Sequence, residues 1–522
     1  MTGLPQNEFH ENYEVNKIRN SMLTSEAKKS RIQDLKKSFS DSPKNSSFKT
    51  IFNLSNCMVG SSIVVFPLIF STSGVVTSLL VLIFMGVITC KTCLLEIVHF
   101  KVQELDFPDV VQRIMGRKWS FAYCFCSSLL LFITGIIYFM LICNMLYMVI
   151  GFFMRQNGIE VASKDDMVFD RFSYQYVGII MVVFCFILFH LKDLTLILKI
   201  GQFGIVSIAA FIVYIVTKGS ENISKGNVNL DNIKIITPDF ATLCGVFSLS
   251  FMCHNVIIPV IRNNHDETKN QRDIVLGYFM TASIYTIIGF FGCFAIAGLN
   301  PDNLRYDTVL EYFSDDIFTV VIEILLFLQL ISVVPILWYV CRSQFFNLIY
   351  ANEAVPFKYY VLANAVFAIV ALIVQMLNVN PTLIISLNGG VIGYLLVYAI
   401  PIKLHLTCLY KENAMVEEKK EVLPVIREVD ASSNTSPLMP QEKESTFVNT
   451  LISDGITIEN YSPNELKSRQ GSDSKKQMVC RSGHLERKEK IPKRIRYAFY
   501  TTIMLIGLAF AVIKIVNVIM GN

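Results

Sequence analysis

The sequence predicts an all-α polytopic membrane protein with eleven transmembrane helices, and three observations support this fold class. Apolar residues make up 53% of the 522 residues and charged residues only 17%, whereas soluble domains carry about 25% charged residues. The apolar residues gather in runs of roughly 20, the length that crosses a ~30 Å hydrocarbon core as a helix. The charges are concentrated in residues 1–50 and 409–496. These observations exclude a cytosolic enzyme, a nucleic-acid-binding protein and a disulfide-built secreted module.

Ten apolar segments follow one another from Ile51 to about Thr407, and an eleventh follows later in the chain. Segments longer than the bilayer is thick, such as the third and the eighth, can tilt or extend beyond it. The first residues are polar and Lys-rich and lack the apolar core of a signal peptide. The predicted spans are residues 51–71, 76–100, 120–153, 174–191, 195–217, 239–261, 275–299, 316–350, 357–378, 382–407 and 497–520.

The positions of Lys and Arg predict the orientation, because these residues accumulate in cytosolic loops. The tail before the first span is rich in them, whereas the loop around 302–316 is acidic. We therefore place the N-terminus in the cytosol. The insert between the last two spans is rich in Ser, Lys, Glu, Asn and Pro, a composition typical of disorder. The predicted regions are a disordered cytosolic tail (1–48), a ten-span core (49–408), a disordered cytosolic insert (409–496) and an eleventh helix with a short lumenal C-terminus (497–522).

The cysteines indicate no disulfide framework, and one sequon indicates a glycosylation site. Twelve of the thirteen cysteines lie in or at the ends of apolar spans, where small thiols pack as apolar residues. No loop expected to face the lumen holds a pair of cysteines. Asn222-Ile223-Ser224 is an N-glycosylation sequon between spans five and six, on the side expected to be lumenal. We therefore predict a glycan at Asn222.

Two of the spans contain interruptions. In the first span, Gly60, Ser61 and Ser62 stand in mid-span, and Pro67 follows. In the sixth, residues 245–255 combine a glycine, serines and a histidine. A membrane helix needs every backbone group bonded, so an interruption in mid-bilayer is costly unless it lines a cavity. Because the two spans are five apart, they would open the two halves of an inverted five-plus-five repeat, whose broken helices hold a substrate near the midplane.

The chemistry of such a break suits an amino acid. A half-helix beginning at Ser61 or Ser62 points unpaired N–H groups and its positive dipole end into the cavity, where they can bind a carboxylate. Carbonyls freed around Asn56 and Met58 can bind a small cation, and a hydroxyl among residues 329–335 of the eighth span can complete that site. The alternative is that glycine and serine only let the helices pack closely.

Four polar residues within the spans are further candidates. His254 can titrate near neutral pH, and an ionisable residue inside a membrane span suggests a functional site; the alternative is a hydrogen bond to a neighbouring helix. Asn144 is a candidate for the cavity. Glu96 and Glu323 lie near the ends of spans two and eight, where we expect snorkelling or solvation.

A series of short motifs in a fixed order carries a family resemblance. The motifs are Phe52 to Asn56 with Pro67, Asn56 to Ile63, Phe107 to Val110, Tyr138 followed by Asn144, His254-Asn255, Asn263-Asn264 with Arg272-Asp273, and Gln329 to Ser332 with Pro335 and Arg342. Together they resemble the sodium-coupled neutral amino acid transporters, within the amino acid/auxin permease superfamily, and match best the lysosomal, arginine-responsive branch. The resemblance covers most of residues 49–401 and the last span.

This resemblance implies a fold of the bacterial leucine-transporter type and secondary active amino acid transport by alternating access. It implies a sodium site at Asn56 and Ser332, and residence in a lysosomal, late endosomal or vacuolar membrane, with the plasma membrane as the alternative. No other cofactor is expected. The predicted contacts of the amino acid are Met58, Gly60, Ser61, Ser62, Asn144, Ser250 and His254.

A second hypothesis is an amino acid sensor. In the lysosomal relatives the N-terminal tail binds the Rag GTPase–Ragulator complex, and residues 9–13 of this chain are similar to that tail. A membrane enzyme is not favoured, because no Ser-His-Asp, His-rich or paired-carboxylate arrangement lies among the spans. The sequence leaves open which amino acid is carried, in which direction, and whether sodium or protons drive it.

Overall fold

The computed structural model describes residues 44–520 apart from 101–103, 105, 165, 167, 169, 191–203, 229–232, 298–307, 314–315, 351–354 and 412–492. Within these residues the regular structure is helical, with two isolated β-bridges besides, so the predicted all-α class is confirmed. Described residues 44–405 and 504–520 belong to one compact unit, and 406–411 and 493–503 to a second. The predicted tail and insert lie almost entirely outside the described residues, and their boundaries stay predictions.

Among the described residues, seven helices are long and apolar enough to cross a membrane. Within the described residues, each predicted span overlaps a helix or a pair of half-helices, whereas the count of eleven crossings and the inverted repeat stay predictions. The long helices are α4 (Val75–Val98), α6 (Arg117–Gln156), α9 (Gly204–Ser224), α12 (Asn270–Ile296), α13 (Ile317–Tyr350), α14 (Phe357–Met376), and α15 (Pro381–Leu387) continued by the π-helical η6 (Asn388–Ala399). The shorter or less completely described ones are α5 (Phe107–Met115), α7 (Tyr174–Leu188) and α19 (Lys493–Met520).

The first and sixth spans are broken, as the sequence predicts. The first consists of α2 (Ser47–Met58), the short 3-10 helix η1 (Ser61–Val64) and α3 (Phe66–Thr72). Pro67 stands in the first turn of α3, where its missing N–H removes no helical hydrogen bond. The sixth consists of α10 (Phe240–Ser250) and α11 (Ile257–Arg262), with residues 251–256 between them.

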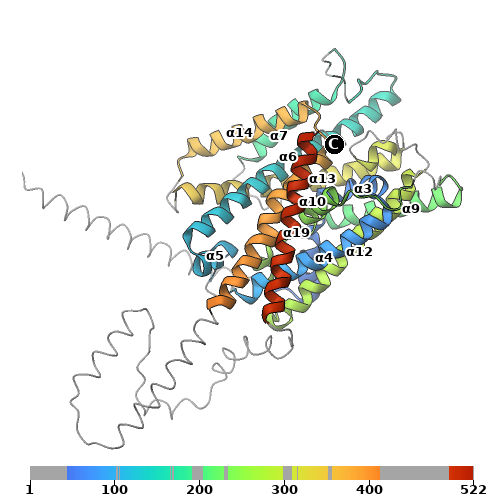
Figure 1. Ribbon diagram of the computed structural model, residues 1–522. Coiled ribbons are helices and arrows are strands. Elements are labelled where there is room, and N and C mark those ends of the chain that lie inside the picture. Colours follow the sequence, from blue (N-terminus) through green and yellow to red (C-terminus); the bar gives the residue numbers. More distant parts are fainter. Residues whose placement is uncertain are drawn as a thin grey trace, which may run out of the picture. The chain divides into compact units, whose positions relative to one another are not determined.

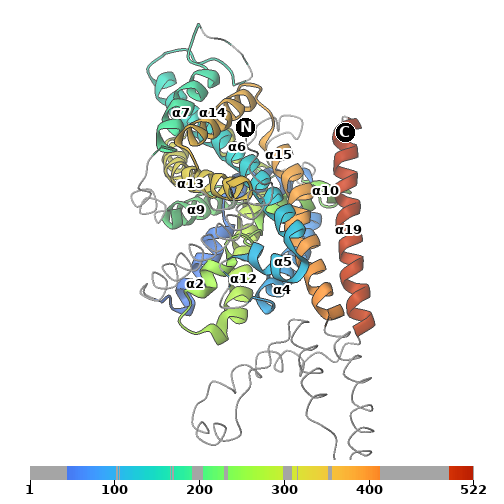
Figure 2. The same cartoon turned by 90° about the vertical axis from the view of Figure 1, so that its left-hand side faces the viewer.

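The packing within the first unit encloses both breaks. α6 packs along α13, and α12 packs against α2, α3 and α9 (Figures 1 and 2). α10 approaches α15 and η6 so closely that a Cβ added to Gly389 would lie 2.0 Å from the carbonyl oxygen of Gly245. Such contact between backbones is typical of small residues in membrane helices. For Gly245, therefore, the alternative that glycine lets the helices pack closely is correct.

Candidate functional site

The first break lies between α2 and η1. α2 ends at Met58, and Gly60 leaves the helical conformation (φ −118°, ψ −144°) before η1 begins at Ser61. The side chains of Met58 and Ser62 are buried, whereas the side chain of Ser61 lies outside the described part of the structure. The first predicted interruption is thus a real change of backbone direction.

Tyr138 of α6 closes one side of this break. A Cβ added to Gly60 would lie 2.5 Å from the Tyr138 hydroxyl oxygen, well inside van der Waals contact. Since the Tyr138 side chain is buried and protein interiors are close-packed, it has little room to retreat. A side chain at position 60 would therefore have to displace the Tyr138 hydroxyl.

The second break begins where α10 ends, at Ser250. The Ser250 hydroxyl donates to the Val246 carbonyl at 2.8 Å, within its own helix, so the carbonyl of Ser250 rather than its hydroxyl faces the break. A single backbone hydrogen bond, from Val256 N–H to the Cys253 carbonyl at 3.0 Å, closes a turn inside residues 251–256. The backbone here is available for other partners.

Tyr285 of α12 connects the two breaks. Its hydroxyl lies 2.7 Å from the Met58 carbonyl oxygen and 2.8 Å from the Ser250 carbonyl oxygen, and it also bonds to the Ser62 side chain. A phenol has one proton, so the two carbonyls share it. The sequence did not identify Tyr285 as a site residue. The one feature that could have identified it is a tyrosine in the middle of an apolar span, because a buried tyrosine hydroxyl needs a hydrogen-bond partner.

His254 points from the second break to α4. Its Nε2 lies 3.1 Å from Thr92 Oγ1, whereas its buried Nδ1 has no hydrogen-bond partner among the described residues. The alternative of a hydrogen bond to a neighbouring helix is therefore present in the structure. The role of His254 as a substrate contact stays a prediction.

Asn144 bonds to the connection between α12 and α13 rather than to either break. Its Nδ2 donates to Glu311 Oε1 at 2.8 Å, in the short helix η5 (Val309–Phe313). Lys164 reaches the other oxygen of Glu311 at 3.4 Å. Asn144 and Lys164 thus join α6 and the segment after it to the connection between α12 and α13.

The two predicted sodium ligands lie on different helices. Asn56 stands in the last turn of α2, and Ser332 is buried in α13, where its hydroxyl donates to the Gln329 carbonyl at 2.6 Å. The lone pairs of the Ser332 oxygen are still available to a cation. Whether the two residues share a sodium ion stays a prediction.

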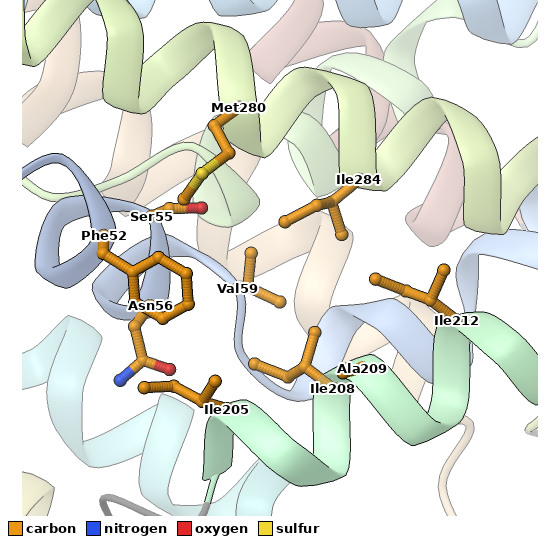
Figure 3. A pocket seen from close by; sticks show the side chains of 10 residues that line it. All are labelled: Phe52, Ser55, Asn56, Val59, Ile205, Ile208, Ala209, Ile212, Met280 and Ile284. Carbon is orange, nitrogen blue, oxygen red and sulfur yellow. The ribbon is translucent and has the colours of Figure 1, made fainter. Parts of the chain in front are cut away.

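Asn56 also borders a cavity of about 190 Å³ between α2, α9 and α12 (Figure 3). Apart from Asn56 and Ser55 the lining is apolar. It consists of Phe52, Val59, Ile205, Ile208, Ala209, Ile212, Met280 and Ile284. This cavity lies on the flank of α2, next to the break.

Asn222 stands within the last turn of α9 and not in the loop that the sequence predicts, because α9 runs from residue 204 to 224 whereas the predicted span ends at 217. Its side-chain nitrogen, the atom that a glycan would modify, donates to the Ala295 carbonyl at 2.6 Å. Glycosylation of Asn222 stays a prediction.

Comparisons with known proteins found a matching family and several relatives. The family model described as "Transmembrane amino acid transporter protein" matches residues 43–426. Neutral amino acid transporter 9 of Xenopus tropicalis is 24% identical over 425 residues, which is 71% of this chain and 76% of that protein. The sodium-coupled neutral amino acid transporter 9 homolog of Caenorhabditis elegans is 23% identical over 419 residues, 69% and 68% respectively. Among solved structures, MhsT in complex with L-phenylalanine matches with a TM-score of 0.43 at 13% identity, covering 69% of this chain and 97% of that one.

Proposed function

The chain belongs to the transmembrane amino acid transporter family, and from this we propose that its two broken helices hold the transported amino acid during alternating access. The observation that carries the proposal is the position of Tyr285, whose hydroxyl lies within 2.7 and 2.8 Å of the carbonyls at which α2 and α10 end. One residue therefore brings the two interruptions to the same place in the fold.

The proposed site has the polarity of a zwitterion. Both α2 and α10 direct their C-terminal ends, which carry partial negative charge, at the break, and this suits an ammonium group. The Met58 and Ser250 carbonyls each have a second lone pair for it. N–H groups of the unwound stretches are donors for the carboxylate. Met58, Gly60, Ser61, Ser62 and Ser250 would thus contact the two groups that all amino acids share.

Movement between the two access states also has a structural basis. The cavity beside α2 leaves this half-helix without a tightly packed neighbour on that flank (Figure 3). The contacts of Glu311 with Asn144 and Lys164 would open by exchanging their hydrogen bonds for water as access changes. We propose sodium as the coupling ion at Asn56 and Ser332.

Counterflow tests the proposed function. Proteoliposomes with the purified protein and an internal pool of unlabelled amino acid are expected to take up the same labelled amino acid, because exchange needs only a working site. A panel of neutral and cationic amino acids identifies the substrate, and replacement of sodium by choline tests the ion. Absence of exchange for every amino acid in both buffers would contradict the proposal.

Sensing is a second candidate, favoured by one contact. Asn45, just before α2, donates its N–H to the Asn263 carbonyl at 2.7 Å and accepts from His265 N–H at 2.9 Å. Asn45, which lies between the N-terminal tail and α2, is thus bonded to the connection between α11 and α12. This connection follows the second break. A shift of α11 would be transmitted to the tail. We propose that the tail reports occupancy to a Rag GTPase–Ragulator-type complex at a lysosomal or late endosomal membrane, the plasma membrane being the alternative.

A pull-down tests the sensor. Full-length protein in detergent is expected to retain the complex to a degree that changes with added amino acid, whereas a variant lacking residues 1–43 is expected to retain none. Equal capture with and without amino acid, or capture by the truncated variant, would leave transport as the function.

A further inference from the structure

Two cysteines that are 160 positions apart in the sequence meet at the second break. Cys93 lies on α4 and Cys253 within residues 251–256, and their sulfur atoms lie 3.8 Å apart. Both are free thiols. A disulfide bond is ~2.0 Å long, so joining the two sulfur atoms needs a relative shift of about 1.8 Å. Because residues 251–256 lie between the two helices of the sixth span, this stretch can supply the shift.

α4 packs directly against the second break. A Cβ added to Gly86 of α4 would lie 3.2 Å from the ring of Phe251, and Thr92 Oγ1 lies 3.1 Å from His254 Nε2. With the two sulfur atoms, three contacts therefore join this stretch to α4. None of the three is covalent, so residues 251–256 can leave α4 when the broken helix moves. A disulfide bond between the two cysteines would make the contact permanent.

Hydrogen bonds set the direction of both thiols. Tyr278 of α12 donates its hydroxyl proton to the Phe251 carbonyl at 3.1 Å, so its oxygen is left to accept from the Cys253 thiol, 3.3 Å away. The Cys253 sulfur is then the acceptor for the Cys93 thiol. The alternative is that the two cysteines only pack as apolar residues. Against this, the chain of hydrogen bonds holds the two sulfur atoms facing each other.

The surrounding packing protects the pair in this conformation. Cys93 is 0% and Cys253 2% exposed, and buried thiols are inert because the thiolate is the reactive form. Glu96, in the last turn of α4, is 0% exposed, so the expectation that it snorkels is wrong; Glu323 of α13 is 1% exposed, so its expected solvation is wrong as well. An oxidant in solution therefore reaches Cys253 after residues 251–256 have moved away from α4.

We propose that Cys93 and Cys253 form a redox modification site, and that a disulfide bond between them stops transport. The effect on transport rests on the proposed function, since it is the movement of the second broken helix that the bond would prevent. The oxidant is a peroxide, and hydrogen peroxide is the smallest of this class. A thiol reductant reverses the modification by breaking the disulfide bond.

The oxidation takes two balanced steps. When the stretch is open, the Cys253 sulfur attacks one oxygen of hydrogen peroxide; the O–O bond breaks, an S–O bond forms, and the products are a sulfenic acid and water. When the stretch returns to α4, the Cys93 sulfur attacks the sulfenic sulfur. An S–S bond forms, the S–O bond breaks, and the leaving hydroxide takes the Cys93 proton to give a second water. The two thiols lose two electrons, and the peroxide gains them.

The full-length protein in proteoliposomes provides the test. Counterflow of labelled amino acid is measured before hydrogen peroxide, after it, and again after dithiothreitol. At each stage, mass spectrometry of the unreduced digest measures the peptide that links Cys93 to Cys253. In the wild type, counterflow is expected to fall in proportion to the linked fraction, and dithiothreitol is expected to restore it.

Two variants show whether the effect arises at this pair. Cys93→Ala removes one partner and is expected to keep its counterflow in hydrogen peroxide. The matched control replaces two other buried cysteines on neighbouring helices, Cys143→Ala on α6 with Cys185→Ala on α7. This double variant is expected to form the linked peptide and to lose counterflow as the wild type does.

The outcomes separate the two proposals. Absence of the linked peptide in the wild type overturns the site, and a linked protein with unchanged counterflow overturns its effect on transport. Equal loss of counterflow in Cys93→Ala and in the wild type overturns the proposal too. If Cys93→Ala does not exchange before oxidation, Cys253→Ala takes its place; if neither exchanges, the wild type decides, by whether counterflow returns as the linked peptide disappears. No counterflow in the untreated wild type overturns the transport function, whereas the linked peptide still tests the site.

Discussion

Replacement of Gly60 by leucine is expected to abolish amino acid uptake in proteoliposomes while the protein stays folded. Even the first added carbon would lie 2.5 Å from the hydroxyl oxygen of the buried Tyr138, and overpacking of this kind costs about 1–3 kcal/mol. The smaller change Gly60→Ala is expected to lower counterflow by about tenfold, since 1.4 kcal/mol corresponds to that factor. Initial rates of counterflow with size-exclusion profiles and melting temperatures are the measurements.

Two further variants show whether the effect arises at the break. In the double variant Gly60→Ala with Tyr138→Phe the overlapping oxygen is gone, and the next atom lies 3.7 Å from the new carbon, so partial recovery is expected. Gly390→Ala adds a methyl in a membrane helix at ordinary contact, 3.6 Å from Gly245 Cα, and is expected to transport normally. Normal flux in Gly60→Leu would remove the first break from the substrate site.

Tyr285→Phe is expected to reduce transport by about 10- to 100-fold. The substitution keeps the ring, which packs against Phe66 and Phe251, but leaves the Met58 and Ser250 carbonyls without their shared donor. A buried polar group without a partner costs about 1–3 kcal/mol. Because these carbonyls end the two half-helices, the loss affects the breaks directly. Counterflow rates and the dependence of rate on amino acid concentration measure the effect.

Tyr214→Phe is the matched control for this change. Tyr214 is buried on α9, and its hydroxyl bonds to Thr319 Oγ1 at 2.6 Å, away from either break. Both variants are expected to lower the melting temperature by similar amounts, whereas only Tyr285→Phe is expected to lose transport. Equal transport in the two variants would show that Tyr285 contributes stability alone.

The helices of this protein follow closely from local sequence. Apolar runs of membrane length predict helices because the bilayer leaves backbone groups no other partners, and within the described residues the predicted spans overlap helices. The interruption at Gly60 was predictable from a glycine followed by two serines, which are poor helix formers. The second interruption was predicted within residues 245–255, but the break at 251–256 contains neither glycine nor proline, so local composition does not explain where α10 ends. Helix limits were less accurate, as the shift of α9 at Asn222 shows.

The site depends on contacts between residues that are distant in sequence. Tyr285 meets Met58, 227 positions away, and Asn144 meets Glu311 instead of a break. The burial of Glu96 depends on which neighbours cover the last turn of α4. The sequence by itself determined the membrane-spanning helices and the two weak points, because these depend on hydropathy and backbone bonding within one segment. Only the tertiary structure decided which side chains meet at those points, because helix packing, and not hydropathy, sets which face of each helix is turned to which neighbour.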